Sequence, residues 1–197
     1  MIQLSPRVLL YEVNQPQPEL RDGWIALPHV RDKAFGDGSH PTTRICAGAI
    51  DLLCQQLARQ GNDFSVLDVG TGTAVLARIA RARGARFIVG TDIDPEALKS
   101  AQFHTSLDSH SVPILISDDF PEHWGARFDL VVANILEAPL RQLAKRLSQA
   151  LALQGRLLIS GFTRVQIPGL RLAFEEQGLT SVSESELDGW VMLLFRR

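Results

Sequence analysis

The chain of 197 residues has few cysteines, almost no net charge and no long apolar segment. Its two cysteines, Cys46 and Cys54, fall in one expected helix without a CxxC motif, which favours two small buried side chains over a disulfide or a metal site. A formal net charge of −2 argues against non-specific nucleic-acid binding. No apolar run approaches the length of a membrane span, and residues 1–15 lack a signal-peptide core. These absences predict a cytoplasmic protein without a membrane or metal partner.

The most regular part of the sequence is the stretch 64–94, in which two short apolar runs flank a helical pattern. The run Phe64–Val69 ends in a turn containing Gly70 and Gly72, and a second run at 87–90 ends shortly before Asp92. A strand that enters a helix through glycines leaves backbone N–H groups free at the helix start. The stretch therefore predicts a nucleoside-cofactor site.

The rest of the chain continues this alternation of apolar runs and helical patterns. Further strands are expected at 112–116, 128–133, 157–160, 179–187 and 190–195. The pair Asp188-Gly189 joins the last two and is typical of a β-hairpin. We therefore predict an α/β fold with a mostly parallel seven-stranded sheet, helices on both faces and an antiparallel strand from the C-terminal hairpin.

Several side chains of the expected helices can be assigned to a face. Two helices have leucine-rich apolar faces, comprising Ile45, Ala49, Leu52, Leu53 and Leu57 in the first and Leu136, Leu140, Leu143, Leu147 and Leu151 in the second. Asp94 followed by Pro95 predicts an N-cap and a first helical residue. The cluster of Arg78, Arg81, Arg83 and Arg86 is most simply a solvated helix face.

Residues 1–38 are less regular than the remainder and too short to form a core of their own. We expect an N-terminal extension here, with possible strands at 8–13 and 24–27 and a loop over the cofactor, followed by the main domain at 39–197. The loop AFGDGSHPTT, residues 34–43, is rich in turn formers. Ser39, Thr42 and Thr43 fit simple N-capping of the next helix, whereas Phe35 either packs in the core or folds over a ligand.

The glycine turn differs from a dinucleotide fingerprint because Val75 stands where the third glycine of GxGxxG would be. Asp68, two residues before Gly70, fits an ammonium group held over the turn. Asp92 fits two ribose hydroxyls, and Asp118 fits an adenine amino group. Together these acceptors favour S-adenosylmethionine. Each alone has a simpler explanation, such as a tight turn at Gly70 and Gly72 or a cap at Asp118 or Asp119.

Longer runs of the sequence resemble one family. The runs FGDGSHPTTR, VLDVGTGTAVLA, VGTDIDPEAL and FDLVVANIL, with GWVMLLFRR at the end, are similar to the catalytic domain of the PrmA family from about Trp24 to the C-terminus. That family comprises bacterial class I methyltransferases with a Rossmann-like fold that act on ribosomal protein L11. The resemblance implies that S-adenosylmethionine is the cofactor and that 39–197 is a methyltransferase domain.

The resemblance also assigns residues. It implies that the loop Phe35–Thr43 covers the cofactor, that Thr43 and Gly70 contact it, and that Asp92 holds the ribose. Asn134 would lie where methionine and substrate amine meet, and its side-chain oxygen and the Ile135 carbonyl would orient the amine. No dedicated base is evident, since a lone histidine such as His40 or His104 is more often structural.

Two features separate the chain from the family pattern. Ala74 stands where family members have a glycine, and residues 1–38 are too few for the family's N-terminal recognition domain. The resemblance implies an N-methyltransferase acting on a lysine or N-terminal amine of a ribosomal or other protein, and the two departures leave its substrate and activity open. Three alternatives remain, namely a small-molecule methyltransferase, a cofactor-binding module without catalysis, and an NAD-dependent oxidoreductase.

Overall fold

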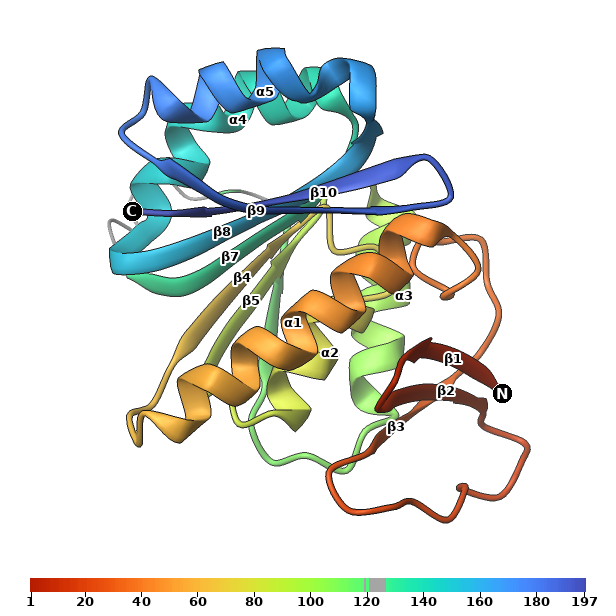
Figure 1. The fold of residues 1–197 in the computed structure, drawn as a ribbon. Helices are drawn as coiled ribbons and strands as arrows, with labels where there is room; N and C mark the ends of the chain where they lie inside the picture. The colour runs from red at the N-terminus through yellow and green to blue at the C-terminus, as the bar shows by residue number, and fades with distance from the viewer. Residues whose placement is uncertain (119, 121–126) are drawn as a thin grey trace.

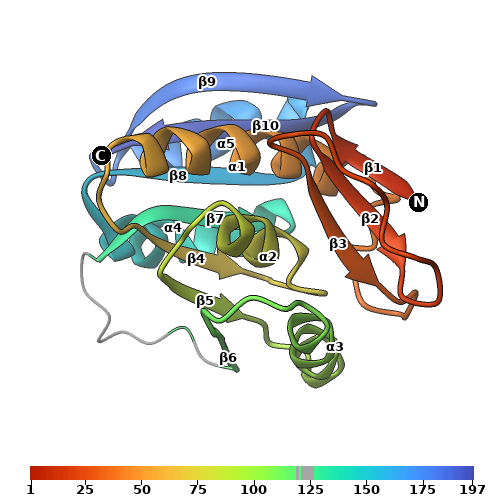
Figure 2. The ribbon, with the colours of Figure 1, turned by 90° about the horizontal axis from the view of Figure 1, so that it is seen from below.

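A single seven-stranded sheet forms the centre of the molecule (Figures 1 and 2). The computed structural model describes residues 1–118, 120 and 127–197, so that Asp119, considered above as a cap, lies outside the described residues. The sheet has the order β6-β5-β4-β7-β8-β10-β9. In chain order its strands are β4 (Ser65–Val69), β5 (Phe87–Thr91), β6 (Ile114–Ser117), β7 (Phe128–Asn134), β8 (Leu151–Thr163), β9 (Thr180–Leu187) and β10 (Trp190–Arg196).

The strand directions confirm the predicted topology. Strands β4, β5, β6, β7 and β8 pair in parallel, whereas β10 is antiparallel to both β8 and β9. The β9–β10 hairpin turns at Asp188 and Gly189, whose φ angles are +49° and +80°. Two consecutive left-handed residues match the twist of a two-residue hairpin, which explains the Asp-Gly pair.

Helices cover both faces of the sheet, as the sequence predicts (Figure 2). One face carries α1 (Pro41–Arg59), α2 (Val75–Ala82) and α3 (Pro95–Ser106), and the other carries α4 (Glu137–Ala150) and α5 (Ile167–Glu175), which follows a 3-10 turn, η2 (Arg164–Gln166). Alternate strand residues divide between two hydrophobic clusters. Val66 and Val132 pack with α1 and α2, whereas Leu67 and Val131 pack with α4.

A second, smaller sheet lies beside α1 and consists of β1 (Ile2–Ser5), β2 (Val8–Glu12) and β3 (Ile25–His29). Strand β1 pairs with β2 antiparallel, and β3 pairs with β2 in parallel. Leu4, Leu10 and Leu27 from this sheet belong to the same hydrophobic cluster as α1 and α2. The two expected strands are confirmed, while β1 was not predicted because four residues carry too little pattern to distinguish a strand from a loop.

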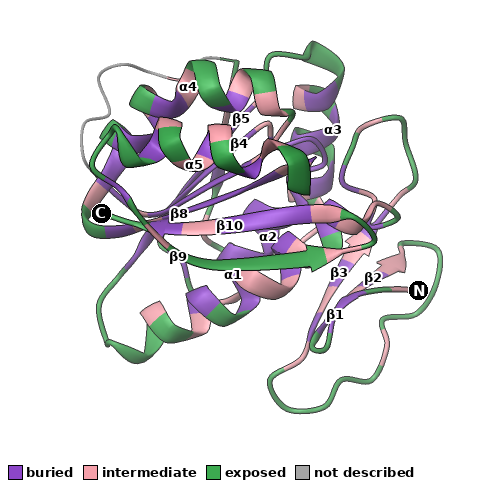
Figure 3. Ribbon diagram, turned by 45° about the horizontal axis from the view of Figure 1, so that its top comes forward, coloured by how far each residue is buried: buried purple, intermediate pink, exposed green. Residues whose placement is uncertain are grey.

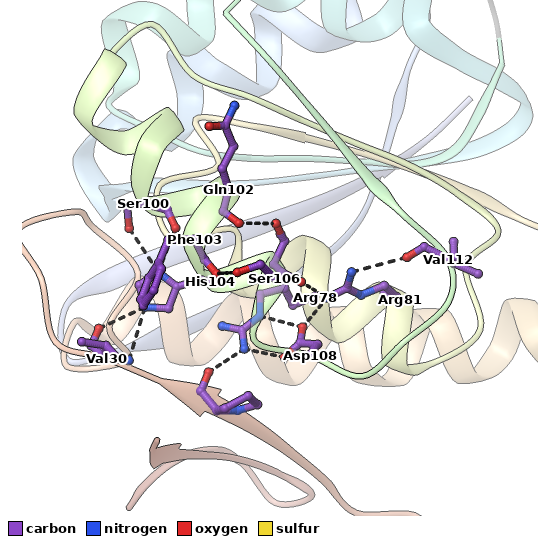
Figure 4. Close-up of polar contacts among 12 residues, drawn as sticks. Val30, Arg78, Arg81, Ser100, Gln102, Phe103, His104, Ser106, Asp108 and Val112 are labelled. Carbon is purple, nitrogen blue, oxygen red and sulfur yellow. Dashed lines mark hydrogen bonds and ion pairs between the residues drawn. The ribbon is translucent and has the colours of Figure 1, made fainter. Parts of the chain in front are cut away.

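The expectation of a solvated arginine face on α2 is wrong for Arg78 and Arg81. Both are buried, and both pair with Asp108 in the loop after α3 (Figure 4). Arg78 Nη2 lies 2.7 Å from Asp108 Oδ1 and also donates to the Pro28 carbonyl at 2.6 Å. Arg83 pairs with Asp51 of α1, and of the four only Arg86 is exposed. The pattern of α2 alone cannot reveal this, because the covering residues come from β3 and the loop after α3.

Two of the expected apolar helix faces also need correction. Leu52 of α1 and Leu136 just before α4 are 62% and 67% exposed, and Leu151 belongs to β8 rather than to α4. The apolar face of α1 instead includes Cys46 and Cys54, which are buried and unbonded as expected. Asp94 caps α3 by accepting from the Glu96 amide, as predicted. Within the described part of the chain, no helix combines the length and apolar character that crossing a membrane requires.

Candidate cofactor site

A cavity of about 540 Å³ opens where β4, β5 and β7 end. Ligands of open α/β sheets bind at the carboxyl ends of the strands, at the point where the strand order reverses. In this sheet that point lies between β4 and β7. Six of the predicted site residues line it, namely Phe35, Gly70, Asp92, Asp118, Asn134 and Ile135. Thr43, Asp68 and Gly72 are not among the lining residues. The lining also includes residues that the sequence analysis did not assign to the site, among them His40, Ile93, Leu136, Arg146, Gly161 and Trp190.

The glycine turn between β4 and α2 is fixed by its neighbours. The amides of Gly70 and Thr71 both donate to the Thr91 carbonyl, at 2.8 and 2.9 Å. Gly72 has a φ of +54°, and a Cβ there would lie 2.2 Å from the Phe35 carbonyl oxygen. Gly72 is therefore required for the close approach of the residue 30–40 backbone, a reason that sequence reasoning did not identify.

Asp68 supports the turn from beneath. Its carboxylate is 1% exposed, and Oδ2 accepts from the Thr71 hydroxyl at 2.7 Å and from the Ala77 amide at 3.3 Å. The second oxygen, Oδ1, is buried without a partner. Burial raises the pKa of Asp68 to about 6, although the hydrogen bonds from Thr71 and Ala77 oppose the shift. A buried acceptor that lacks a donor is suited to a cationic group of a ligand.

Asp92 and Asp118 supply two more carboxylates from neighbouring strands. Asp92 follows β5 and accepts from the Gly72 amide at 3.0 Å and from the Asp94 amide at 3.1 Å. A carboxylate has about four acceptor sites, so Asp92 keeps capacity for ligand hydroxyls. Asp118 follows β6 and is exposed at the edge of the same cavity.

The turn after β7 contributes Asn134 and Ile135 to the lining of the cavity. Asn134 ends the strand, and its Oδ1 is buried without a partner. The next residue, Ile135, lies between two glycines: a Cβ on Gly70 would lie 2.2 Å from Ile135 Cγ2, and one on Gly161 would lie 2.2 Å from the Ile135 carbonyl oxygen. Gly161 therefore has no side chain because the Ile135 backbone occupies the space, and only the folded sheet reveals this.

The covering loop, defined as residues 30–40, passes over one side of the cavity. Phe35 is 50% exposed, and its ring lies 5.2 Å from that of His40, which in turn lies 4.7 Å from the Trp190 ring. The structure thus places Phe35 at the cavity rather than in the core. Thr43, at the start of α1, is buried with its hydroxyl oxygen unpartnered.

Both histidines discussed above have structural contacts. His40 is the N-cap of α1, with Nδ1 accepting from the Thr42 amide at 3.3 Å, so the expectation that Ser39, Thr42 or Thr43 caps this helix is wrong. His104 is buried, with Nε2 3.0 Å from the Val30 carbonyl oxygen and Nδ1 2.9 Å from that of Ser100 (Figure 4). His104 thereby ties the start of the covering loop to α3.

The hydrogen-bonding groups at the cavity distinguish between cofactors. The lining provides Asn134 Oδ1 and the carboxylates of Asp92 and Asp118 as acceptors, and the unpartnered oxygens of Thr43 and Asp68 belong to the chain neighbours of the lining residues Thr42 and Val69. Among the described lining residues Arg146 is the one arginine or lysine, and its guanidinium stacks 4.7 Å over Phe120 and donates to the Phe120 carbonyl. Acceptors in excess fit a ligand with an ammonium group, hydroxyls and an amino group, as in S-adenosylmethionine, better than the pyrophosphate of a dinucleotide.

The sheet order and the antiparallel β10 define the fold of the class I methyltransferases. Solved structures agree. The fold superposes on the crystal structure of ribosomal protein L11 methylase from Lactobacillus delbrueckii subsp. bulgaricus with a TM-score of 0.84 and 25% identity, covering 100% of this chain and 97% of that one. A magnesium protoporphyrin IX methyltransferase from Synechocystis PCC 6803, solved with bound S-adenosylmethionine, shares the fold, with a TM-score of 0.58, 19% identity and coverage of 78% and 81%.

The sequence specifies the particular family. The model described as Ribosomal protein L11 methyltransferase (PrmA) matches residues 25–197, and the chain therefore belongs to the PrmA family. A ribosomal protein L11 methyltransferase from Janthinobacterium sp. (strain Marseille) is 39% identical over 161 residues, and one from Chromohalobacter salexigens is 41% identical over 165 residues. Each match covers 81% of this chain but 50% and 52% of the relatives, so the chain spans about half their length.

Proposed function

We propose that the chain is an S-adenosylmethionine-dependent methyltransferase that methylates an amino group, of a lysine or an N-terminus, on a protein substrate. The observation that carries the proposal is the buried, unpartnered Oδ1 of Asn134, a residue that lines the cavity together with Ile135. A buried acceptor without a donor suits an N–H group of an amine. Because the similar proteins are ribosomal protein L11 methyltransferases, ribosomal protein L11 is the first substrate to test.

The proposed binding roles follow the acceptors. Asp68 Oδ1 holds the ammonium group of the cofactor, Asp92 the ribose hydroxyls and Asp118 the adenine amino group. Phe35 and Thr43 contact the cofactor from the side of the covering loop and α1, and Gly70 and Gly72 do so from the turn. In this assignment residues 1–38 form an extension that ends in the covering loop, and residues 39–197 form the methyltransferase domain.

In the proposed reaction, the protein contributes mainly by positioning the substrate amine relative to the methyl group of the cofactor. S-adenosylmethionine provides an electrophilic methyl group on a sulfonium. Asn134 Oδ1 and the Ile135 carbonyl accept hydrogen bonds from the N–H groups of the amine and so direct its lone pair toward the methyl position. A lysine ammonium, with a free pKa of ~10.4, first gives a proton to water. His40 is poorly suited as a base, because its Nδ1 accepts from the Thr42 amide and leaves the proton of the neutral ring on Nε2.

Methyl transfer from isotopically labelled S-adenosylmethionine tests the proposal. The native protein should label purified bacterial ribosomal protein L11 or a protein band of a cell extract, and hydrolysis should recover the label on amino nitrogens. Asn134→Ala should lower the rate at saturating donor at least 100-fold, as expected when a positioning contact is lost. Asn62→Ala, at an exposed asparagine, is the matched control and should label normally.

Other outcomes favour the alternatives. Label in small metabolites without label in protein would replace the proposed substrate by a small molecule. Binding of the donor without any transfer would favour the non-catalytic module suggested by Ala74.

A further inference from the structure

Thr73 lies between the glycine turn and the covering loop and was not assigned by the sequence analysis. It is fully buried and is not among the residues that line the cavity. Its amide donates to the Phe35 carbonyl at 2.9 Å, and its hydroxyl donates to the Gly36 carbonyl at 3.0 Å. One residue thus binds two successive carbonyls of the covering loop.

The backbone around these two hydrogen bonds leaves no room for a side chain at residue 36 or 72. A Cβ on Gly36 would lie 2.6 Å from the Thr73 hydroxyl oxygen, and a Cβ on Gly72 would lie 2.2 Å from the Phe35 carbonyl oxygen. Both glycines have positive φ angles, +108° and +54°. The contact is therefore a close backbone approach built from both sides, since side chains at either position would separate the loop from the turn.

Three further contacts fix the ends of the covering loop. At its start, His104 lies within hydrogen-bond distance of the Val30 carbonyl, as Figure 4 shows, and the Ser100 hydroxyl donates to Asp32. Near its end, Gly38 packs on the small sheet, where an added Cβ would lie 2.4 Å from Leu4 Cδ2. Between these points the loop carries Phe35, which lines the cavity, and the bonds to Thr73 are those that tie this part to the cofactor turn.

We propose that Thr73 is a positioning residue that holds Phe35 and the covering loop against the cofactor site through its hydroxyl. The Gly36 carbonyl loses its buried donor when the hydroxyl is removed, and the loop then opens more often. Because the cavity is bounded by Phe35 on this side, opening shortens the residence of a bound cofactor. The effect on cofactor residence rests on the proposed function, whereas the effect on loop opening concerns the free protein.

Amide hydrogen exchange of the free protein tests the hydroxyl directly. Thr73→Val removes the donor at nearly constant shape, and Thr73→Ser keeps it. In the valine variant we expect about tenfold faster exchange of the Thr73 amide, which donates to the Phe35 carbonyl of the loop, with α4 and β7 unchanged. Tenfold is the factor for one buried hydrogen bond. The serine variant should remain within about threefold of native. Thr105→Val is the control, because the Thr105 hydroxyl also donates to a carbonyl at 3.0 Å but lies exposed on α3.

The dissociation rate of S-adenosylhomocysteine provides the second measurement. We expect it to rise about tenfold in Thr73→Val and to stay near native in Thr73→Ser and Thr105→Val. The proposal is overturned if exchange of this amide in the valine variant is within twofold of native, if exchange rises equally throughout the protein, or if serine fails to rescue. If the native protein binds no S-adenosylhomocysteine, the proposed function fails, and hydrogen exchange still decides the role of Thr73.

Discussion

Two regions of this molecule bury polar groups to a similar extent and use them differently. In the first, which we call the anchor, Arg78 and Arg81 both pair with Asp108, and Arg78 also binds the Pro28 carbonyl. In the second, the candidate cofactor site, Asn134 Oδ1 has no partner, and neither do the buried Asp68 Oδ1 and Thr43 Oγ1, whose residues do not line the cavity. Asp108 neutralises the two buried guanidinium groups, although Arg78 Nη1 and Arg81 Nε lack a hydrogen-bond partner, and Arg78 also joins the small sheet to α2. The unpartnered atoms of the second region are acceptors, which are available to a cationic or hydroxyl group of a ligand. The difference separates stability from binding within one small protein.

The edge strand β9 is exposed, unlike these two buried regions. Figure 3 shows β9 as largely exposed, in contrast to the buried strands at the centre. Its Glu184 and Glu186 pair with arginines that remain partly or largely exposed. Such surface pairs contribute little to stability, so the polar contribution to stability comes mainly from the buried groups.

Removal of the anchor carboxylate should have the largest effect on stability. Asp108→Ala leaves two buried guanidinium groups without their partner, and breaking a buried pair in this way costs about 3–5 kcal/mol. Urea unfolding should show a loss of this size. The control is Asp63→Ala, because the Asp63–Arg86 pair is exposed and should contribute under about 1 kcal/mol. Equal losses in the two variants would contradict the assigned role of the anchor.

His29, beside the anchor, should make stability fall in acid. It is 2% exposed and stacks on His104 at 4.9 Å, and burial, with the charges of His104 and Arg78, lowers its pKa from 6.5 to about 4. The native state therefore binds a proton less readily than the unfolded state, and stability is lost as the pH falls from 6.5 to 4. The loss is at most about 3 kcal/mol. His29→Phe should show a flatter curve in this window, measured by urea unfolding at each pH.

Asp68, in the cofactor site, should have the opposite pH dependence. Its pKa is raised from 3.8 to about 6 by burial, so the native state holds the proton more tightly than the unfolded state. Its contribution to stability is largest below pH 4 and declines by about 3 kcal/mol as the pH rises to 6. Asp68→Asn should remove this decline and weaken S-adenosylmethionine binding at least 100-fold at pH 7. A variant that binds normally would show that the unpartnered oxygen is not part of the site.

The smallest expected effect belongs to Ala74. It has a φ of +58° and is fully buried, so Ala74→Gly relieves a left-handed conformation worth about 1–2 kcal/mol but loses a buried methyl group of about 1 kcal/mol. The free energy of unfolding should change by about 1 kcal/mol or less, and donor affinity by less than about threefold, in calorimetry. A tenfold gain in affinity would mean that alanine impairs the site.

Local sequence patterns were sufficient for much of the fold and for part of the site. The Asp188-Gly189 hairpin, the Asp94 cap and the parallel strands follow from residues close in sequence. Asp92 was predicted from its position at a strand end, whereas Asn134 was assigned by the resemblance to the PrmA family, and both line the cavity. The buried arginines and the roles of Thr73 and Gly161 could not be predicted, because their partners lie about 26 to 37 residues away in the sequence. The cap by His40 could not be predicted because histidine is an unusual capping residue.

Calorimetric titration of the native protein with S-adenosylmethionine and, separately, with NAD tests the central claim most directly. The account predicts one S-adenosylmethionine bound per chain, weakened at least 100-fold by Asp68→Asn and Asp92→Ala, and no detectable NAD binding. Tight binding of NAD, or S-adenosylmethionine binding that survives both substitutions, would contradict it.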